Sequence, residues 1–450
     1  MSVVSKLELR PARVPSAPGA WPLAGHVPGL IRDPAGFLKA CLASGQSMIE
    51  LRLGPRRPVL LCSAASVHRV LAERAEDFGK GGPFWDAMRP ILGNGVGTCD
   101  GDEHRRQRRL LRPAFNRTAV NGYAEIIDDA AATTARSWRP GQIVQVSSEM
   151  MAFTSRITIR ALLPTVDDAE VERFVQMMPV LTEGAFYQLV LPPSARRLPT
   201  EANRRYERVR VEARDAVQRL VKAALAADES EEGVKCPAHR TGIINSHGVL
   251  GAAIGAGRME PIRPFTDDEL ADQVMTVLFA GIETSANVLS WALYLLASHP
   301  EVADRIVNDP TSHAVDQVIA ETMRLYPPGW LFSRNNVAPI EMFGHYFPAG
   351  SDFIISPYLL HRDPLVFPSP ERFDPERWTS PDSAVKRQYL PFGLGPRRCL
   401  GETLANAEMV AALITLCSQW RFVLPPGTKV APRFRSVLIP HGLALEVQPR

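Results

Sequence analysis

The chain has 450 residues, of which 45% are hydrophobic and 22% charged, with a formal net charge of +3. This composition is typical of a globular protein with a large core, and the nearly neutral charge favours no nucleic-acid partner. Six cysteines are spread along the chain without a Cys-x-x-Cys pair, which argues against a zinc ribbon, a redox dithiol or a disulfide framework. We expect a cytoplasmic protein, because the start lacks a signal-peptide core and no clean run of about 18 apolar residues predicts a membrane span.

In the first half of the chain, the apolar spacing predicts helices after a small β part. We expect a looped stretch over 11–34, a β-hairpin over 48–63, a short helix over 66–75, a loop over 79–104 and helices over 103–220. Breaks in the helical pattern fall near Pro140, near Pro164 and within the proline-rich stretch 189–200.

The second half contains a long helix with a well-marked start. Thr266 is a good N-cap and Glu269 completes a capping box, which predicts a helix of about thirty residues ending near His299. The preceding stretch 228–264, acidic and then rich in Gly and Ala, indicates a mobile connector with room for a short helix.

After the long helix we expect a helix over 315–326, short strands and turns over 327–370, a long helix following residue 399, and strands beyond residue 419. The fold class is therefore mostly α with a minor β part. We expect one domain over 1–450, with β-rich parts near 45–65 and 330–370 and helical parts near 100–326 and 399–418.

The stretch FGLGPRRCLG, residues 392–401, surrounds one cysteine with three glycines, a proline and two arginines. Positive charge and helix N-terminal amides stabilise a thiolate, so Arg397, Arg398 and the helix after Cys399 favour the ionised form. A single rigid thiolate with amide donors suits an axial ligand of haem iron. The alternatives are a catalytic nucleophile, for which no histidine signature is seen, or a buried free thiol.

The same stretch resembles the haem-binding signature of the cytochrome P450 superfamily, through Phe392, Gly395, Arg397, Cys399 and Gly401. The resemblance covers nearly the whole chain and is of the soluble bacterial type. It implies a triangular helical prism with small β-sheets, a long central helix over haem b, and Cys399 as the iron ligand. It also implies haem contacts from Gly393 and Ala280.

The stretch ETMR places Glu321 and Arg324 on one helix face, where they can form an ion pair. Most pairs of this kind are solvated and contribute little energy. The resemblance implies instead that the pair is buried, that Arg377 of FDPERW completes it, and that the three side chains support the cysteine loop.

The stretch AGIETS puts Glu283 and Thr284 in the middle of an apolar helix, where polar side chains are costly unless they have a function. The resemblance implies that Thr284 orients bound dioxygen and that Glu283 helps to deliver protons. The alternative is a core helix, distorted near Gly281, in which Thr284 bonds back to the backbone.

His104 and Arg108 lie four residues apart in GDEHRRQRRLLR and suit a pair of carboxylates. The resemblance implies that both bind the haem propionates together with Arg334, although many family members carry tryptophan where His104 stands. The basic residues Arg105, Arg109 and Arg112 would dock an acidic electron donor. A solvated helix face or a nucleic-acid patch is the alternative.

By resemblance, the substrate pocket takes side chains from four regions and from a late turn, and these are overwhelmingly apolar. They are Phe84, Trp85, Met88, Phe186, Leu278, Phe279, Ala280, Trp330, Leu331, Phe332, Val437 and Leu438. An apolar pocket with few polar anchors suits a lipophilic ligand. The stretch YPPGWLFSR is similar to bacterial terpene oxidases, which favours a sesquiterpene-like substrate over a fatty acid or polyketide.

The resemblance therefore implies a monooxygenase that uses O₂ and electrons from NAD(P)H, delivered by a separate ferredoxin and ferredoxin reductase, and acts as a monomer. Three other classes remain open. A haem-thiolate isomerase or sensor would keep Cys399 but would need no Glu283–Thr284 pair. A cysteine hydrolase would need a base beside Cys399. A basic helical scaffold without enzymatic activity would explain neither the Cys399 loop nor the Glu283–Thr284 pair.

Overall fold

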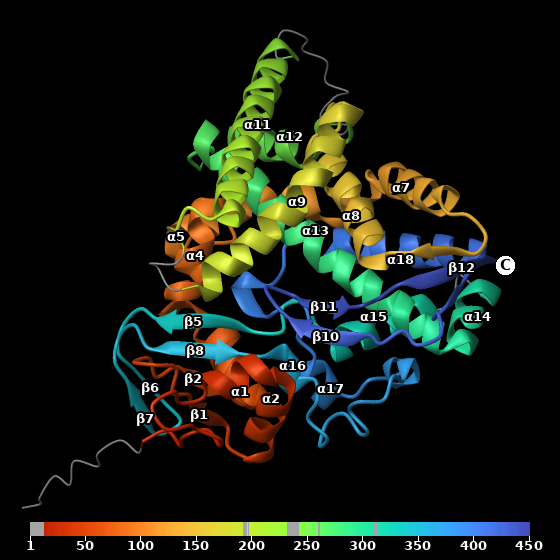
Figure 1. Cartoon of the computed structure of the whole chain (residues 1–450). Helices are drawn as coiled ribbons and strands as arrows, with labels where there is room; N and C mark the ends of the chain where they lie inside the picture. The colour runs from red at the N-terminus through yellow and green to blue at the C-terminus, as the bar shows by residue number, and fades with distance from the viewer. Residues whose placement is uncertain (1–12, 192–195, 197, 232–242, 260–261, 310–312) are drawn as a thin grey trace, which may run out of the picture.

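A computed structural model describes residues 13–191, 196, 198–231, 243–259, 262–309 and 313–450, and all structural statements concern these residues. Figure 1 shows the long helices in the upper and right-hand parts of the molecule and the largest β-sheet at the lower left. The predicted fold class, mostly α with small sheets, is confirmed.

The larger helices make up the helical layer. They are α4 (Pro83–Leu92), α5 (Gly101–Leu111), α7 (Ala124–Ser137), α8 (Val146–Leu162), α9 (Asp168–Val190), α11 (Glu201–Glu231), α12 (Ile243–Met259), α13 (Asp267–Ser298), α14 (Pro300–Asn308), α15 (Ala314–Leu325) and α18 (Glu402–Gln419). The shorter helices are α1 (Val27–Arg32), α2 (Pro34–Ala43), α3 (Ala64–His68), α6 (Arg117–Asn121), α16 (Pro357–Leu360) and α17 (Ser383–Gln388). Single turns include η1 (Arg69–Glu73), η5 (Pro375–Trp378) and η6 (Gly395–Arg397).

The predicted long helix is α13, which crosses the centre of the molecule and packs along α8 (Figure 1). Its start is the predicted capping box, in which the Thr266 hydroxyl accepts from the Glu269 amide over 3.3 Å and the Glu269 carboxylate accepts from the Thr266 amide over 2.8 Å. α13 is also the one described helix long and apolar enough to cross a membrane, but 72% of its most apolar window is buried inside the protein. It is therefore the central helix of the core.

Four small sheets complete the fold. The largest has the strand order β1 (Met48–Glu50), β2 (Val59–Leu61), β8 (Asp352–Ile355), β5 (Phe332–Asn336) and β3 (Phe78–Gly79), with β2 and β8 parallel and the other pairs antiparallel. A second sheet has the order β4 (Gln142–Val144), β12 (Leu445–Pro449) and β9 (Trp420–Val423). Two hairpins are formed by β6 (Ile340–Met342) with β7 (His345–Phe347) and by β10 (Ala431–Phe434) with β11 (Leu438–His441). The hairpin predicted over 48–63 is confirmed as β1 and β2.

Two hydrophobic cores correspond to these layers. The larger core lies among the long helices around α8, α13 and α18, and the smaller one lies between the largest sheet, α2 and α16. The partly buried ring of Tyr326, just after α15, packs against both cores. The end of α15 thus joins the helical layer to the sheet layer.

The prediction of a loop over 79–104 is wrong in part, because residues 83–92 form α4. Pro83 stands in the first turn of the helix, where a missing amide costs nothing, and Gly93 ends the helix with a φ of 62°. These signals are present in the sequence but are masked by the many glycines on either side.

The connector predicted over 228–264 is helical in its described parts. α11 continues to Glu231, and α12 covers Ile243–Met259 with a kink at Gly248, whereas residues 232–242 and 260–261 lie outside the described residues. Val249, Leu250 and Ala253 of α12 are buried against neighbouring helices. This packing supplies the stability that a Gly- and Ala-rich stretch lacks on its own.

Candidate functional site

The Cys399 loop is fixed by a backbone hydrogen bond and by glycines in left-handed conformations. The Cys399 amide donates to the Phe392 carbonyl over 2.8 Å. Gly393 and Gly395 have φ values of 70° and 72°, which side chains disfavour. A Cβ atom added to Gly395 would lie 1.9 Å from the carbonyl oxygen of Leu71. Only glycine therefore allows the loop to approach η1 this closely.

The thiol of Cys399 is accessible, yet protein atoms surround it. Burial raises the pKa of this thiol above its usual value, and the Glu402 carboxylate adds to the rise. A hydrogen bond from the Gly401 amide and the charges of Arg108 and Arg398 act to lower the thiol pKa. Arg398 is also bound to Glu402 through two hydrogen bonds of 2.6 Å, so the effects of these two side chains on the thiol largely cancel.

In the free protein, burial therefore opposes the effect of neighbouring charge that the sequence analysis expected at Cys399. Arg397 donates to the Asp100 carboxylate over 2.5 Å and to the carbonyl oxygen of Cys99 over 2.9 Å, rather than acting on the sulfur. Burial outweighs the charges that remain. A metal ion bound to the sulfur would deprotonate it directly, since coordinated thiols lose their proton.

Five basic side chains from distant parts of the chain gather beside this loop: Lys80, His104, Arg108, Arg334 and Arg397. Burial, followed by repulsion among these groups, lowers the pKa of Arg334 to about 9 and that of His104 to about 3. His104 is thus neutral unless an anion lies next to it, whereas the sequence suggested a cation.

The composition of this cluster makes it a binding site for anions. Asp100 is the carboxylate that opposes the pKa shifts of Lys80, Arg334 and Arg397. Buried cations are stable only when they are paired and hydrogen-bonded. Two more carboxylates would relieve the repulsion, so the two propionates of haem fit the cluster in charge and in chemical type.

Lys80 is a member of this cluster that the sequence analysis missed. Its Nζ donates to the carbonyl oxygen of Gly97 and lies 4.4 Å from the ring centre of Trp85. Its amide donates to both carboxylate oxygens of Asp100 over 2.9 Å. A lysine between glycines, shortly before Phe84 and Trp85, was the one hint that the sequence offered.

The structure brings Glu321, Arg324 and Arg377 together in the interior. Glu321 and Arg324 are both 0% exposed and are joined by two hydrogen bonds of 2.8 Å. Nε of Arg377 lies 3.3 Å from the Glu321 carboxylate, which also accepts from the Asp374 amide over 3.0 Å and the Trp378 indole over 2.9 Å. Every lone-pair direction of this buried carboxylate thus has a donor.

Arg324 uses its remaining donors on backbone carbonyls that belong to no helix or strand. They are those of His361, Pro370 and Arg372, at 3.0, 2.6 and 3.1 Å. The side chain therefore fixes the irregular stretch that leads towards the Cys399 loop.

In the middle of α13, several backbone carbonyls accept side-chain hydrogen bonds. The Thr284 hydroxyl donates to the Ala280 carbonyl over 2.6 Å, and Thr154 of α8 donates to the Ile282 carbonyl over 3.0 Å. Thr284 thus makes the helical back-bond that the alternative interpretation requires, and α13 keeps helical geometry through Gly281.

Glu283 points towards the turn between β10 and β11. Ser436 donates to its carboxylate over 3.4 Å. Burial raises the pKa of Glu283 to about 7, against the opposing effects of Ser436 and Arg435. This carboxyl group can therefore gain and lose a proton near neutral pH.

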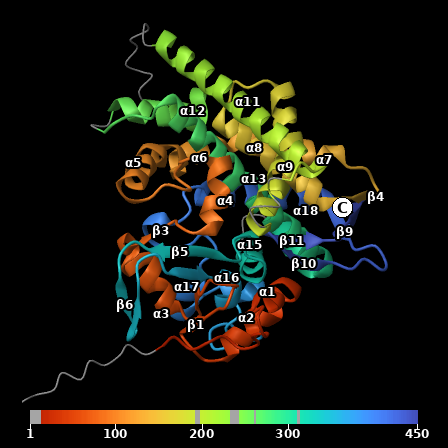
Figure 2. The ribbon, with the colours of Figure 1, turned by 60° about the vertical axis from the view of Figure 1, so that its left-hand side comes forward.

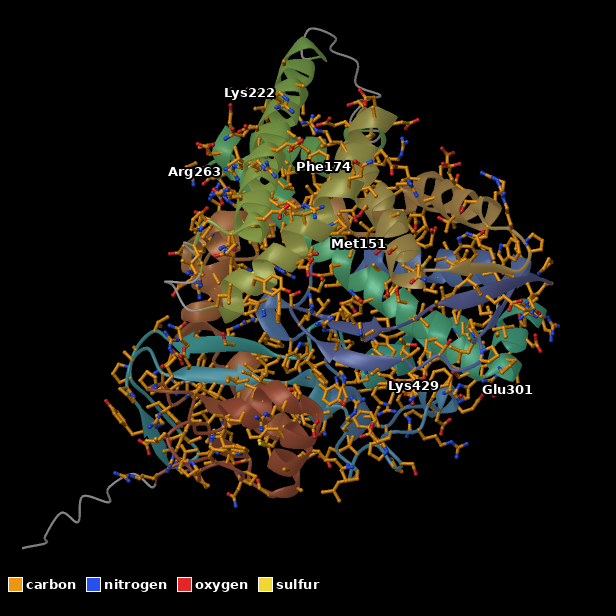
Figure 3. The ribbon with its side chains drawn as sticks, viewed as in Figure 1. Met151, Phe174, Lys222, Arg263, Glu301 and Lys429 are labelled. Carbon is orange, nitrogen blue, oxygen red and sulfur yellow. The ribbon has the colours of Figure 1, made fainter. Side chains whose placement is uncertain are left out.

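A cavity of about 360 Å³ lies beside Glu283, between α8, α9, α13 and the β10–β11 hairpin. Phe186, Arg435 and Ser436 are among its lining residues, and so is Met151 of α8, which Figure 3 labels close to α13. Arg435 forms an ion pair of 3.3 Å with Glu183 of α9 at this cavity. Water in the cavity can reach the Glu283 carboxylate.

The residues predicted to line the substrate pocket lie in several environments. Phe84 and Trp85 of α4 make an edge-to-face contact at 4.9 Å, and Trp330 makes another with Phe434 at 4.9 Å. Ala280 is exposed, although α13 is otherwise mostly buried. The other positions are buried or partly buried in the two cores: Met88, Leu278 and Phe279 in the larger one, and Leu331, Phe332 and Leu438 in the smaller one, with Val437 buried beside it.

Glu408 of α18 is a second buried carboxyl group that the sequence analysis missed. It is 2% exposed, and burial raises its pKa to about 8, against a hydrogen bond from Ser285. Ser285 follows Thr284 in α13, so Glu408 touches the same turn of that helix. Nothing in the sequence pattern of α18 distinguishes this residue from a surface glutamate.

Comparison with known proteins identifies the family. The family model described as Cytochrome P450 matches residues 15–447. This chain is a cytochrome P450. Its cofactor is accordingly haem, and its activity is that of a monooxygenase.

Several curated relatives of this P450 come from Streptomyces. Cyclooctatin synthase of Streptomyces melanosporofaciens is 37% identical, covering 96% of this chain and 95% of the relative. Cyclooctat-9-en-7-ol 5-monooxygenase of the same organism is 34% identical, covering 98% and 96%. Pentalenene oxygenase of Streptomyces avermitilis is 34% identical, covering 97% of each chain.

Solved structures show the same fold. The haem domain of cytochrome P450DA gives a TM-score of 0.80 at 22% identity, covering 98% of each chain. The retinoic acid bound cyanobacterial CYP120A1 gives 0.79 at 24% identity, covering 97% of this P450 and 100% of that chain. At these identities the likeness concerns the fold alone.

Proposed function

We propose that this P450 oxidises a lipophilic terpene, of sesquiterpene-like size, in a bacterial biosynthetic pathway. The observation that carries this proposal is the full-length similarity, at 34–37% identity, to the three relatives from Streptomyces. The names of two of them state the terpene on which they act, cyclooctat-9-en-7-ol and pentalenene. The apolar and aromatic side chains of α4 and of the stretch 330–332 support such a ligand.

Cys399 is the residue that holds the iron in this proposal. Haem supplies the iron centre that activates dioxygen, and the thiolate donates electron density to that iron. The Gly401 amide hydrogen-bonds the sulfur and keeps it oriented. The two propionates would be held by the cation cluster, which consists of Lys80, His104, Arg108, Arg334 and Arg397.

Glu283 and Thr284 move protons to the dioxygen site. Glu283 can take a proton from water in the adjoining cavity, because its pKa of about 7 keeps both forms populated near neutral pH. The Thr284 hydroxyl donates to Ala280 in this structure and would have to rotate to pass on a proton. Terpene hydrocarbons offer few polar atoms, so shape and the exclusion of water would govern their orientation.

Electrons reach the haem from separate proteins, for which we infer a ferredoxin and its reductase in the cytoplasm, with the P450 acting as a monomer. The exposed side chains of Arg105, Arg109 and Arg112 share one side of α5 and the turn after it, close to Arg108 of the cation cluster. An acidic donor fits this face. Charge reversal at Arg105 and Arg112 should slow ferredoxin-supported reduction and leave reduction by dithionite unchanged.

Two measurements test the proposal. The reduced protein with carbon monoxide should show the red-shifted Soret band of a thiolate ligand, and Cys399→Ser should lose that band. Turnover of pentalenene or related cyclic sesquiterpenes under ¹⁸O₂ should then place one ¹⁸O atom in the product. Spin-state shifts with fatty acids alone would favour the fatty-acid alternative, and a product without ¹⁸O would favour an isomerase.

A further inference from the structure

Three large apolar side chains project into solvent from the segment before and within α1. Trp21 is 53% exposed, Leu23 106% and Ile31 73%. No residue of α1 is buried. Single exposed apolar residues are ordinary, but three within eleven residues form a patch that calls for an explanation.

The turn that carries Trp21 and Leu23 is firmly built. The Trp21 amide donates to the Gly25 carbonyl over 2.7 Å, and the Gly25 amide donates back over 3.0 Å. Leu23 adopts a φ of 63°, a conformation that residues with a side chain rarely take. Strain of this kind persists only where the surrounding structure fixes it. The turn thus presents an apolar tip at a cost to the backbone.

The base of the turn is anchored to the strand pair beneath it. The Arg52 carbonyl accepts from the His26 amide over 2.8 Å, and Nδ1 of His26 accepts from the Arg52 amide over 2.8 Å. A Cβ atom added to Gly25 would lie 2.2 Å from the Arg52 carbonyl oxygen. The buried His26 ring therefore locks the apolar turn against β1 and its following residues.

Arginines lie beside the apolar tip and near its base. The Arg32 guanidinium lies 5.3 Å from the ring centre of Trp21. The exposed Arg52 is joined through its amide to His26 at the base of the turn, and Arg57 is exposed in the β1–β2 turn that follows Arg52. The exposed acid in α1 and its flanks, Asp33, uses its carboxylate to cap the amide of Gly36 over 2.9 Å. The patch is therefore apolar at its centre and positive at its rim.

A second exposed aromatic group lies at the same end of the molecule. Figures 1 and 2 are related by rotation about the vertical axis, and both show α1, α2 and the β6–β7 hairpin at the lower end, away from α11. In that hairpin Phe343 is 45% and Tyr346 55% exposed, and Arg69 lies 5.9 Å from the Phe343 ring. The combination of an exposed aromatic ring with an arginine over it thus occurs twice at this end.

We propose that this end of the molecule docks on the surface of a membrane that contains anionic lipids, with Trp21, Leu23 and Ile31 entering the interface. Apolar side chains supply area to bury among the lipid head groups, and arginines attract the negative surface. Each such cation strengthens binding by about fivefold. A second copy that docked by the same face would bring the two positive rims together, and like charges that meet across an interface cost free energy.

The use of such docking rests on the proposed function, because a terpene partitions into lipid and the enzyme would meet it there. The binding itself does not rest on that function. The test therefore measures binding without catalysis, so the failure of one proposal is distinguishable from the failure of the other.

The experiment is co-sedimentation of the full-length holoprotein with two kinds of vesicle. One kind contains phosphatidylcholine and phosphatidylglycerol, and the other phosphatidylcholine alone. The protein should pellet with the anionic vesicles and remain largely in solution with the neutral ones. The triple variants W21S/L23S/I31S and R32Q/R52Q/R57Q should each weaken binding to anionic vesicles by at least tenfold.

Matched controls remove similar groups elsewhere. Leu365→Ser changes a side chain that is 92% exposed outside the patch, and R208Q/R219Q/K222Q removes three charges from α11, where Figure 3 labels Lys222 at the upper end. Both controls should bind as the wild type does. Equal losses in the controls, or wild-type binding by both patch variants, would overturn the proposal. So would a dimer that the patch variants dissociate, without vesicle binding, because the face would then contact a second copy.

Discussion

The Ser436 hydroxyl lies 3.4 Å from the Glu283 carboxylate, so the turn between β10 and β11 contacts the polar pair of α13 directly. The residue next to Ser436 is Val437, a predicted pocket residue. A substrate that moves this turn would change the surroundings of the carboxyl group that we assign to proton delivery.

Substituting Glu283 tests that assignment. Glu283→Gln should lower the product formed per NAD(P)H by roughly tenfold, as should Thr284→Ala, because proton delivery to bound dioxygen fails. In the wild type, product yield should fall as the pH rises through about 7, where Glu283 loses its proton. Glu283→Gln should remove this pH dependence.

Ser436→Ala tests the same assignment through the pKa of Glu283. The Ser436 hydrogen bond lowers the pKa of Glu283, so its loss should raise that pKa and shift the fall in yield to higher pH. An unchanged pH profile in both variants would show that Glu283 does not deliver the proton.

Lys80→Met should weaken the hold on haem. Loss of one charge-assisted contact to a propionate should speed haem transfer to apomyoglobin by about tenfold or more. Removing a cation near the iron also favours the ferric state, so the reduction potential should fall. Lys80→Arg should retain most of both properties, and Lys39→Met, at an exposed position of α2, should change neither. Equal transfer rates in all variants would remove Lys80 from the propionate site.

Glu321→Gln should destabilise the fold by about 3–5 kcal/mol, because it leaves the buried Arg324 without a charged partner. Urea unfolding of the purified protein measures this change. If Glu321→Gln does not accumulate as folded protein, Arg377→Gln removes one of the five hydrogen bonds to the same carboxylate and should cause a smaller loss. Arg173→Met breaks the surface pair with Glu212 and should leave the midpoint unchanged. Equal midpoints for all three variants would contradict a supporting role for the buried cluster.

Glu408 should make stability depend on pH. The unfolded chain releases the Glu408 proton near pH 4.5, whereas the folded protein keeps it to about pH 8. The folded state binds more protons across this window, so the free energy of unfolding should fall as pH rises from about 4.5 to 8. Glu408→Gln should flatten the curve of urea midpoint against pH, and Glu301→Gln, at an exposed position of α14, should not. A wild-type slope in Glu408→Gln would place the pH dependence elsewhere.

Local signals made much of the fold and of the Cys399 loop predictable. The start of α13 follows from Thr266 and Glu269, and the tight loop around Cys399 follows from its glycines. The helices α4 and α12 were harder, because they begin among glycines and are stabilised by packing against distant helices. Where the stability of a helix comes from tertiary contacts, the local sequence pattern does not predict it.

The electrostatic features of the site were the least predictable. Lys80 looks like a loop lysine in the sequence and becomes a buried cation only because β3, β5 and the Cys399 loop bring residues 80, 334 and 397 together. Similarly, the spacing of His104 and Arg108 suggested a charged imidazole, but His104 is neutral because it lies among four more basic side chains. The sum of burial and charge that sets a pKa depends on contacts far apart in the chain.

The hydrogen bonds of Arg324 affect the order in which parts of the chain fold. The stretch between α16 and α17 contains one short helical turn, η5, and no strand in the described structure, so its shape depends on side-chain bonds to three of its carbonyls. That stretch cannot acquire its native path until α15 has formed and placed the guanidinium. Its amides should therefore gain protection from hydrogen exchange late in refolding, and all at the same time. A single side chain, that of Arg324, would then determine when some twenty residues become ordered.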